Sequence, residues 1–315
     1  MAVTDLAPTE EIQELRGRYR AFMEEHVYPN ERALHADDAE LIRSLQAKAK
    51  EQGLWAPHVP PEAGGTGQGF LAYAHLNEEI GRSTYAQLVF GCQAPDAGNA
   101  EILHLFGTDE QKERWLKPLV AGEIRSFFSM TEPEVPGSDP TTLRTKAVRD
   151  GDEWVIDGHK WFSSGADGAA FGIVMAVTDP EAEPHRRASQ IVVPADTRGV
   201  EIVGPTPVFG HAGSGWSTHC EVWYRRVRVP RTGFARTAGR RGLGRPRPGD
   251  RPRRPPGVGQ GRRHPGQLRP ARGRALDPRR ISLMSPGAGP IWQPGGEAWD
   301  RARPWIVCVA LLTAP

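Results

Sequence analysis

Hydrophobic residues recur at steps of three and four through the first 120 residues, a spacing typical of amphipathic helices. Three such stripes are Ile12, Leu15, Tyr19, Phe22, Met23 and Val27; Leu41, Ile42, Leu45 and Ala49; and Leu71, Ala74, His75 and Ile80. Thr108 and Gln111 have the spacing of a capping box, with acidic residues in the first turn that follows. We therefore predict that residues 1–124 form a helical domain.

Near residue 125 the hydrophobic period changes to two, which indicates strands. The stretch "TKAVRDGDEWVIDGHKWF" contains Asp150-Gly151 and Asp157-Gly158, and such pairs accommodate the positive φ angles of tight hairpin turns. Further strands are predicted at "FGIVMAV", "SQIVVP", "VEIVG" and "THCEVWYRRVRVP". Short strands at this density favour an antiparallel barrel or sandwich over residues 125–232. The predicted fold class is α+β, a helical domain followed by a β domain.

The glycine-rich segment "PPEAGGTGQG", residues 60–69, is the one that most resembles a phosphate-binding loop. No predicted strand precedes it and no Gly-Lys-Ser/Thr follows, so the nucleotide-binding fingerprints are not satisfied. We predict a plain connection between two helices.

The composition is that of a globular protein, with 38% hydrophobic and 25% charged residues in 315. The start resembles neither a secretory nor a transit sequence, and the longest apolar run, "PWIVCVALLTAP", is about half the ~20 residues of a membrane span. We expect a cytoplasmic protein that does not enter a membrane. Cys92, Cys220 and Cys308 have no CxxC spacing, which favours reduced thiols. Neither they nor His211 and His219 show the spacing of a metal site.

Charge divides the chain into two unlike parts. Residues 1–230 contain 34 acidic and 22 basic side chains, whereas residues 231–315 contain 4 and 18. Residues 231–280 alone contain 16 Arg, 10 Gly and 8 Pro and no Lys, too little apolar surface to offset the entropy of folding. We expect residues 233–315 to be a disordered tail. Such a segment is either a frame-shifted translation of GC-rich codons, which we favour, or an arginine-rich arm for nucleic acid.

The segment "FFSMTEPEVPGSDP" at the border of the two domains, followed by "WVIDGHKWFSSGADGAAFGIVMAVTDP", resembles the acyl-CoA dehydrogenase family. "GTDEQKERWLKPLVAGEIRSFFSMTEP" is similar to the family's approach to its flavin loop. The resemblance covers about residues 10–230. It implies an N-terminal helical domain and a middle β-barrel domain, whereas the Arg/Pro/Gly-rich tail replaces the family's C-terminal helical bundle, so we expect a truncated chain.

The resemblance also implies a bound FAD. The residues that it assigns to the cofactor are Phe128, Met130, Thr131, Gly137, Ser138, Phe162, Ser163 and Ser164. Thr131 is expected on the pyrimidine side of the ring, Ser164 at its N5 atom, and Ser138 between cofactor and acyl-CoA. Phe162 replaces the family's usual Trp, which keeps an aromatic face without the indole N–H. The structural alternative is that Phe128, Met130 and Phe162 are core side chains and that Thr131 to Asp139 is a turn stabilised by its own side chains.

The implied activity is α,β-dehydrogenation of an acyl-CoA, with electrons passed to an electron-transfer flavoprotein. The family's catalytic carboxylate, and much of the interface of its homo-oligomers, lie in the third domain. We therefore nominate no catalytic base, do not extend the oligomer to this chain, and expect weak FAD binding and impaired turnover. Two alternatives stay open: an acyl-CoA oxidase, and a non-enzymatic nucleic-acid-binding protein that uses the tail. Acyl-chain specificity cannot be read from the sequence.

Overall fold

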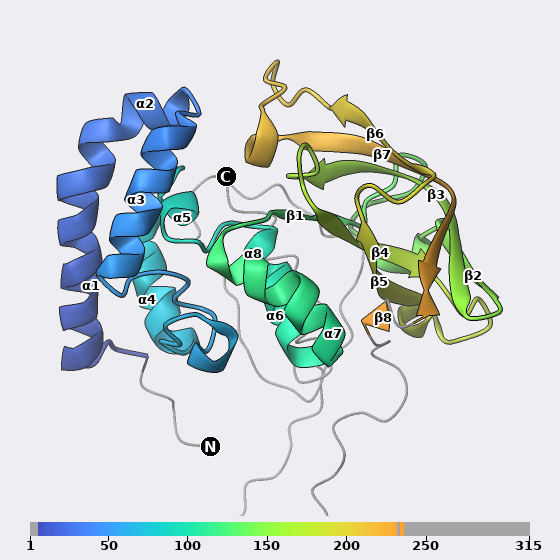
Figure 1. Cartoon of the computed structure of the whole chain (residues 1–315), viewed down its shortest axis with the longest axis horizontal. Coiled ribbons are helices and arrows are strands. Elements are labelled where there is room, and N and C mark those ends of the chain that lie inside the picture. The colour runs from blue at the N-terminus through green and yellow to red at the C-terminus, as the bar shows by residue number, and fades with distance from the viewer. Residues whose placement is uncertain (1–5, 232–233, 236–315) are drawn as a thin grey trace, which may run out of the picture. The chain divides into compact units, whose positions relative to one another are not determined.

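The computed structural model describes residues 6–231 and 234–235 (Figure 1). Helices and helical turns come first. They are α1 (Glu10–Phe22), η1 (Met23–Val27), η2 (Tyr28–Asn30), α2 (Glu31–His35), α3 (Ala39–Glu51), η3 (Pro61–Ala63), α4 (Phe70–Ile80), α5 (Ala86–Val89), α6 (Asp96–Phe106), α7 (Asp109–Gln111), η4 (Lys112–Leu116) and α8 (Lys117–Ala121). The capping box between Thr108 and Gln111 is confirmed, because each side chain accepts a hydrogen bond from the other residue's backbone N–H.

The predicted hydrophobic stripes match the buried faces of the first two long helices but not of the third. Tyr19, Phe22, Met23 and Val27 are all buried, as are Leu45 and Ala49 of α3. In α4 the prediction was wrong in part, since Ala74 is exposed and Leu71 and His75 are only partly buried. The buried positions of α4 are Ala72, Leu76, Glu79 and Ile80. A buried carboxylate, which a search for apolar periodicity ignores, therefore belongs to the inner face of this helix.

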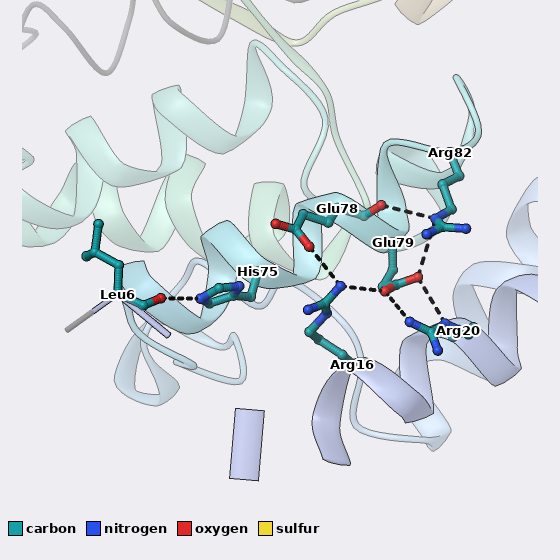
Figure 2. Close-up of polar contacts among 7 residues, drawn as sticks. All are labelled: Leu6, Arg16, Arg20, His75, Glu78, Glu79 and Arg82. Carbon is teal, nitrogen blue, oxygen red and sulfur yellow. Dashed lines mark hydrogen bonds and ion pairs between the residues drawn. The ribbon is translucent and has the colours of Figure 1, made fainter. Parts of the chain in front are cut away.

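Glu79 joins α4 to α1 through arginine side chains (Figure 2). Arg20 donates to the Glu79 carboxylate at 2.7 Å and Arg16 at 2.9 Å, and Arg82 forms an ion pair with it at 3.4 Å. Arg16 also donates to Glu78 at 2.7 Å. The hydrogen bond from Arg20 is the main cause that lowers the pKa of Glu79. The carboxylate is 1% exposed, so it is stable as an anion only because these cations surround it.

The second half of the described chain forms one curled sheet. Its strands are β1 (Ser126–Ser129), β2 (Lys146–Asp150), β3 (Glu153–Ser164), β4 (Phe171–Val177), β5 (Ala188–Pro194), β6 (Val200–Pro205), β7 (His219–Pro230) and β8 (Phe234–Ala235). The order is β6-β7-β3-β2-β4-β5-β8, with β1 paired to β4. The predicted antiparallel pairing is confirmed for most neighbours, whereas β1 and β2 both lie parallel to β4.

The two Asp-Gly pairs behave differently. Asp150-Gly151 makes the predicted hairpin turn, since Asp150 pairs with Glu153 and Gly151 has φ of 61°. Asp157-Gly158 does not turn the chain, so that prediction was wrong. It lies inside β3 at a shift of register, where a Cβ on Gly158 would be 2.2 Å from the Thr145 hydroxyl oxygen. Glycine is needed there for close approach of two segments rather than for a turn.

Two hydrophobic clusters form the core, and one of them crosses from the helices to the sheet. Residues of β1, β4 and β5 pack against the helices in that cluster, with the rings of Trp115 and Phe171 4.9 Å apart. Asp96, in the first turn of α6, accepts the backbone N–H of Ser126 at 2.7 Å, and Asn99 donates to the Phe127 carbonyl at 3.0 Å. The start of β1 is thereby fixed to α6, which sets the position of the segment that follows it.

The structure also bears on several of the remaining sequence predictions. Residues 60–69 connect α3 to α4, as predicted, and Cys92 and Cys220 are buried free thiols. Among the described helices, none combines the length and apolar character that a membrane span requires. Phe234–Ala235, inside the range predicted to be disordered, pair with β5, because an edge strand can recruit any extended backbone. The predictions for Cys308 and for the rest of the tail lie outside the described residues.

Candidate functional site

The two motifs that the sequence separates by about thirty residues lie against each other. Residues 129–132 leave the end of β1 and run beside the last residues of β3. The hydroxyl oxygens of Ser129 and Ser163 are 2.9 Å apart, and the backbone N–H of Trp161 donates to the Thr131 carbonyl at 3.1 Å. The predicted pairing of motifs is therefore a physical contact.

A buried lysine, which the sequence analysis did not single out, bridges the same two segments. Lys160 donates from Nζ to the Met130 carbonyl at 2.7 Å and to Oε1 of Glu132 at 2.9 Å. The Glu132 carboxylate also accepts the backbone N–H groups of Arg144 and Thr145, at 2.7 and 2.8 Å. The sequence offers no local signal for this contact, because Lys160 and Glu132 are 28 positions apart along the chain.

Opposing effects set the ionisation of this pair. Burial lowers the pKa of Lys160 to about 8, although the Glu132 charge favours the ammonium form. Burial alone would raise the pKa of Glu132, but the Lys160 charge and the hydrogen bonds lower it overall. The side chains are 0% and 1% exposed, so both charges depend on the contacts just described.

Phe162 occupies an unusual backbone conformation. Its φ is 49°, a left-handed value that costs a residue with a side chain about 1 kcal/mol or more. It lies where the register between β3 and β7 shifts, and its side chain is 38% exposed. Its ring packs edge-on against that of Trp161 at 5.0 Å. At this shift in register the Phe162 side chain is therefore only partly covered, and backbone strain of this kind is common at binding sites.

Ser164 and Ser163 use their hydroxyl groups differently. The Ser163 side chain is fully buried and bonded to Ser129. Ser164 lies one residue further on, with its hydroxyl 2.8 Å from Nδ1 of His219, and burial lowers the pKa of that histidine. From the sequence, His219 is considered only as a metal ligand; its proximity to Ser164 has no local signal, because it depends on pairing between β3 and β7.

The other predicted cofactor residues differ in burial and in their contacts with β3. Thr131 and Met130 are partly buried and their backbone carbonyls are bonded to β3, whereas Ser138 is exposed. A Cβ on Gly137 would lie 2.8 Å from Cγ2 of Thr131, so the absence of a side chain permits this approach. Phe128 is buried in the core shared with the helices, in agreement with the structural alternative for that residue.

The next polar group along the loop is also bonded to β3. His159 contacts Glu134 and Glu221, each at 2.9 Å, and stacks on the ring of Trp223 at 3.7 Å. Lys160 and His159 therefore bond to Glu132 and Glu134 from adjacent positions of one strand.

A cavity of about 470 Å³ lies elsewhere in the described structure, lined by residues of α3, α6 and the segment that leads into β1. Arg43, Trp55, His58 and Trp216 belong to this lining, which includes none of the predicted cofactor residues. Within residues 6–231 and 234–235 no group of three His, Cys, Asp or Glu side chains could bind a metal ion.

Comparison with known proteins identifies relatives of both domains. Residues 9–123 match the model "Acyl-CoA dehydrogenase, N-terminal domain", and residues 127–226 match "Acyl-CoA dehydrogenase, middle domain". Probable acyl-CoA dehydrogenase FadE2 of Mycobacterium tuberculosis is 43% identical over 265 residues, which cover 76% of this chain and 63% of FadE2. Acyl-CoA dehydrogenase family member 11 of Mus musculus is 40% identical over 256 residues, which cover 74% of this chain and 32% of the mouse protein.

A solved structure assigned to the same family, from Mycobacterium abscessus, has a TM-score of 0.67 and 42% identity. The match covers 72% of this chain and 60% of the other. The chain therefore spans less than two thirds of the relatives that it matches.

Proposed function

Because the chain belongs to the acyl-CoA dehydrogenase family, we propose that its described residues form one side of an FAD site used to dehydrogenate an acyl-CoA thioester. In this proposal residues 1–124 and 125–232 are the helical and β domains of that enzyme. The observation that carries the proposal is the contact between residues 129–132 and the end of β3.

The chemistry of the donor set fits a flavin ring. An isoalloxazine needs neutral hydrogen-bond donors along its polar edge and an aromatic surface against its faces. Thr131, Ser138 and Ser164 offer hydroxyl groups that do not ionise at neutral pH, and Phe162 offers an exposed ring on a strained backbone. Met130 is proposed to contact the ring beside Thr131. When bound, FAD would accept the hydride that leaves the β carbon of the substrate.

Other predicted residues take supporting roles. Phe128 and Ser163 are proposed to fix the backbone next to the ring, since one side chain lies in the core and the other is bonded to Ser129. Gly137 is proposed to keep the loop close to Thr131, so that Ser138 can meet both cofactor and acyl-CoA. We nominate no base for the α proton, and propose an electron-transfer flavoprotein as the acceptor.

We also propose that this chain binds FAD weakly. In the family, further contacts to FAD are expected from a third domain, whose residues would come after residue 232. At that place this sequence has the Arg/Gly/Pro composition described above. Purified protein with one equivalent of flavin absorbance would contradict this.

FAD titration followed by flavin fluorescence tests the site. We expect saturable binding that Thr131→Val and Ser164→Ala each weaken about threefold to tenfold, by loss of one hydrogen bond. Wild-type protein without saturable binding would refute the site. Anaerobic reduction of bound FAD by acyl-CoA thioesters of increasing length then tests the activity. Oxygen consumption in place of reduction of an electron-transfer flavoprotein would favour the oxidase alternative.

A further inference from the structure

We propose that Lys160 and Glu132 are a positioning pair, which fixes residues 130–132 in the conformation that binds FAD. The inference rests on the proposed function, because it assigns a role toward the same site. It concerns residues that do not themselves belong to the predicted cofactor set.

Three successive residues of the loop are bonded to β3. Lys160 donates to the Met130 carbonyl at 2.7 Å and to the Glu132 carboxylate at 2.9 Å. Between them, the Thr131 carbonyl accepts the backbone N–H of Trp161 at 3.1 Å. Two adjacent residues of β3 therefore fix the backbone at Thr131 and on both sides of it. A fixed backbone in turn limits the directions in which the Thr131 side chain can point.

Glu132 is itself fixed from a second direction. Its carboxylate accepts the backbone N–H groups of Arg144 and Thr145, which precede β2. Because Lys160 lies on β3, the carboxylate connects both β3 and the segment before β2 to the loop. His159 adds a contact of β3 to Glu134, two residues further along the same loop.

Stability alone does not account for a buried pair of this kind. Both side chains lose their hydration, and an attraction at 2.9 Å has to offset that cost. In buried pairs of this kind, apolar residues of similar volume often stabilise a fold as well or better. An apolar pair could not orient the Met130 carbonyl, because dispersion contacts have no preferred direction. The pair is therefore best explained by the geometry that it imposes on residues 130–132.

The double variant Lys160→Met/Glu132→Leu separates positioning from stability. Either single change leaves one buried charge without its partner and should destabilise the protein. The double variant removes both charges and should recover part of that loss, because the Met130 carbonyl and the Arg144 and Thr145 N–H groups still lose their partners. We expect the double variant to bind FAD at least about tenfold more weakly, measured without denaturant under conditions where a urea titration shows that it is folded. We also expect its Trp161 amide to exchange hydrogen faster, while amides of α6 exchange at the wild-type rate.

The control is Glu201→Gln, which breaks the exposed Arg225–Glu201 pair and should leave FAD affinity unchanged. A folded double variant whose FAD affinity lies within twofold of wild type, or whose Trp161 amide exchanges at the wild-type rate, overturns the inference. If the double variant does not fold, Lys160→Met at low temperature decides by the same two measurements. Wild-type protein that does not bind FAD would refute the proposed function and this role with it, whereas wild-type binding with an unaffected double variant refutes the positioning role alone.

Discussion

The hydroxyl oxygens of Ser129 and Ser163 lie 2.9 Å apart in a fully buried environment, although 34 residues separate them along the chain. β1 pairs with β4 rather than with β3, so this bond is not part of a backbone ladder. It shows that two motifs recognised separately in the sequence form one structural unit.

The Ser129 and Ser163 hydroxyls should depend on each other for stability. Ser129→Ala or Ser163→Ala leaves one buried hydroxyl without its partner, at an expected cost of about 1–3 kcal/mol in the free energy of unfolding. The double alanine variant should cost no more than the worse single variant, because no unpartnered hydroxyl remains. Urea denaturation measures all three. Additive losses in the double variant would mean that the two hydroxyls do not depend on each other.

The carboxylate of Glu79 should contribute strongly to the packing of α1 on α4. Glu79→Gln retains an acceptor but leaves Arg20 without its anion and Arg16 with Glu78 alone, so we expect a loss of about 2 kcal/mol in the free energy of unfolding. Glu201→Gln is the matched control, since both members of its ion pair are more than half exposed. There we expect a change below about 0.5 kcal/mol. Equal effects in the two variants would contradict the importance of burial.

His58 should make the protein sensitive to acid. Burial lowers the pKa of His58 to about 4 from an ordinary 6.5, so the unfolded chain binds a proton that the folded chain excludes between these values. Its contribution is complete above pH 6.5 and falls by about 3 kcal/mol as the pH drops to 4. His58→Phe, which keeps a ring next to Tyr73, should remove this part of the acid dependence. Urea midpoints measured from pH 4 to 7 that fall equally in both proteins would contradict it.

Substitutions of Phe162 should affect protein stability and FAD binding differently, because its backbone is strained. Phe162→Gly and Phe162→Ala lose the same aromatic contacts, but only glycine adopts φ of 49° without strain. We expect the glycine variant to be about 1 kcal/mol more stable than the alanine variant, with both weaker in FAD binding than wild type. Thermal or urea unfolding checks the order of the two. A more stable alanine variant would show that the left-handed conformation does not persist.

Much of this fold can be read from local patterns. The capping box at Thr108, the stripe on α1 and the turn at Asp150-Gly151 are local, so a few neighbouring residues determine them. Asp157-Gly158 has the same local sequence as a turn, but packing of Gly158 against Thr145 places it inside β3 instead. The buried face of α4 was misjudged for a related reason, since Glu79 is buried only because α1 supplies its arginines.

The candidate site shows the same limit. Resemblance to a family located the motifs that contain Thr131 and Ser164, but it carried no information on what their neighbours contact. The contacts of Lys160 and His219 depend on how β1, β3 and β7 meet, and such long-range pairing has no local signature. The buried hydroxyl of Ser163 likewise became apparent only with Ser129 opposite it.

The proposed function requires that the loop after β1 and the end of β3 together bind a flavin ring. The decisive experiment is an FAD titration of wild type, Phe162→Ala and Phe209→Ala. Phe209 is a matched control, because it is also an exposed phenylalanine in the left-handed conformation, with φ of 48°. We expect saturable binding that the Phe162 variant weakens about tenfold and the Phe209 variant leaves unchanged. Absence of binding in wild type, or equal affinities in all three proteins, would contradict it.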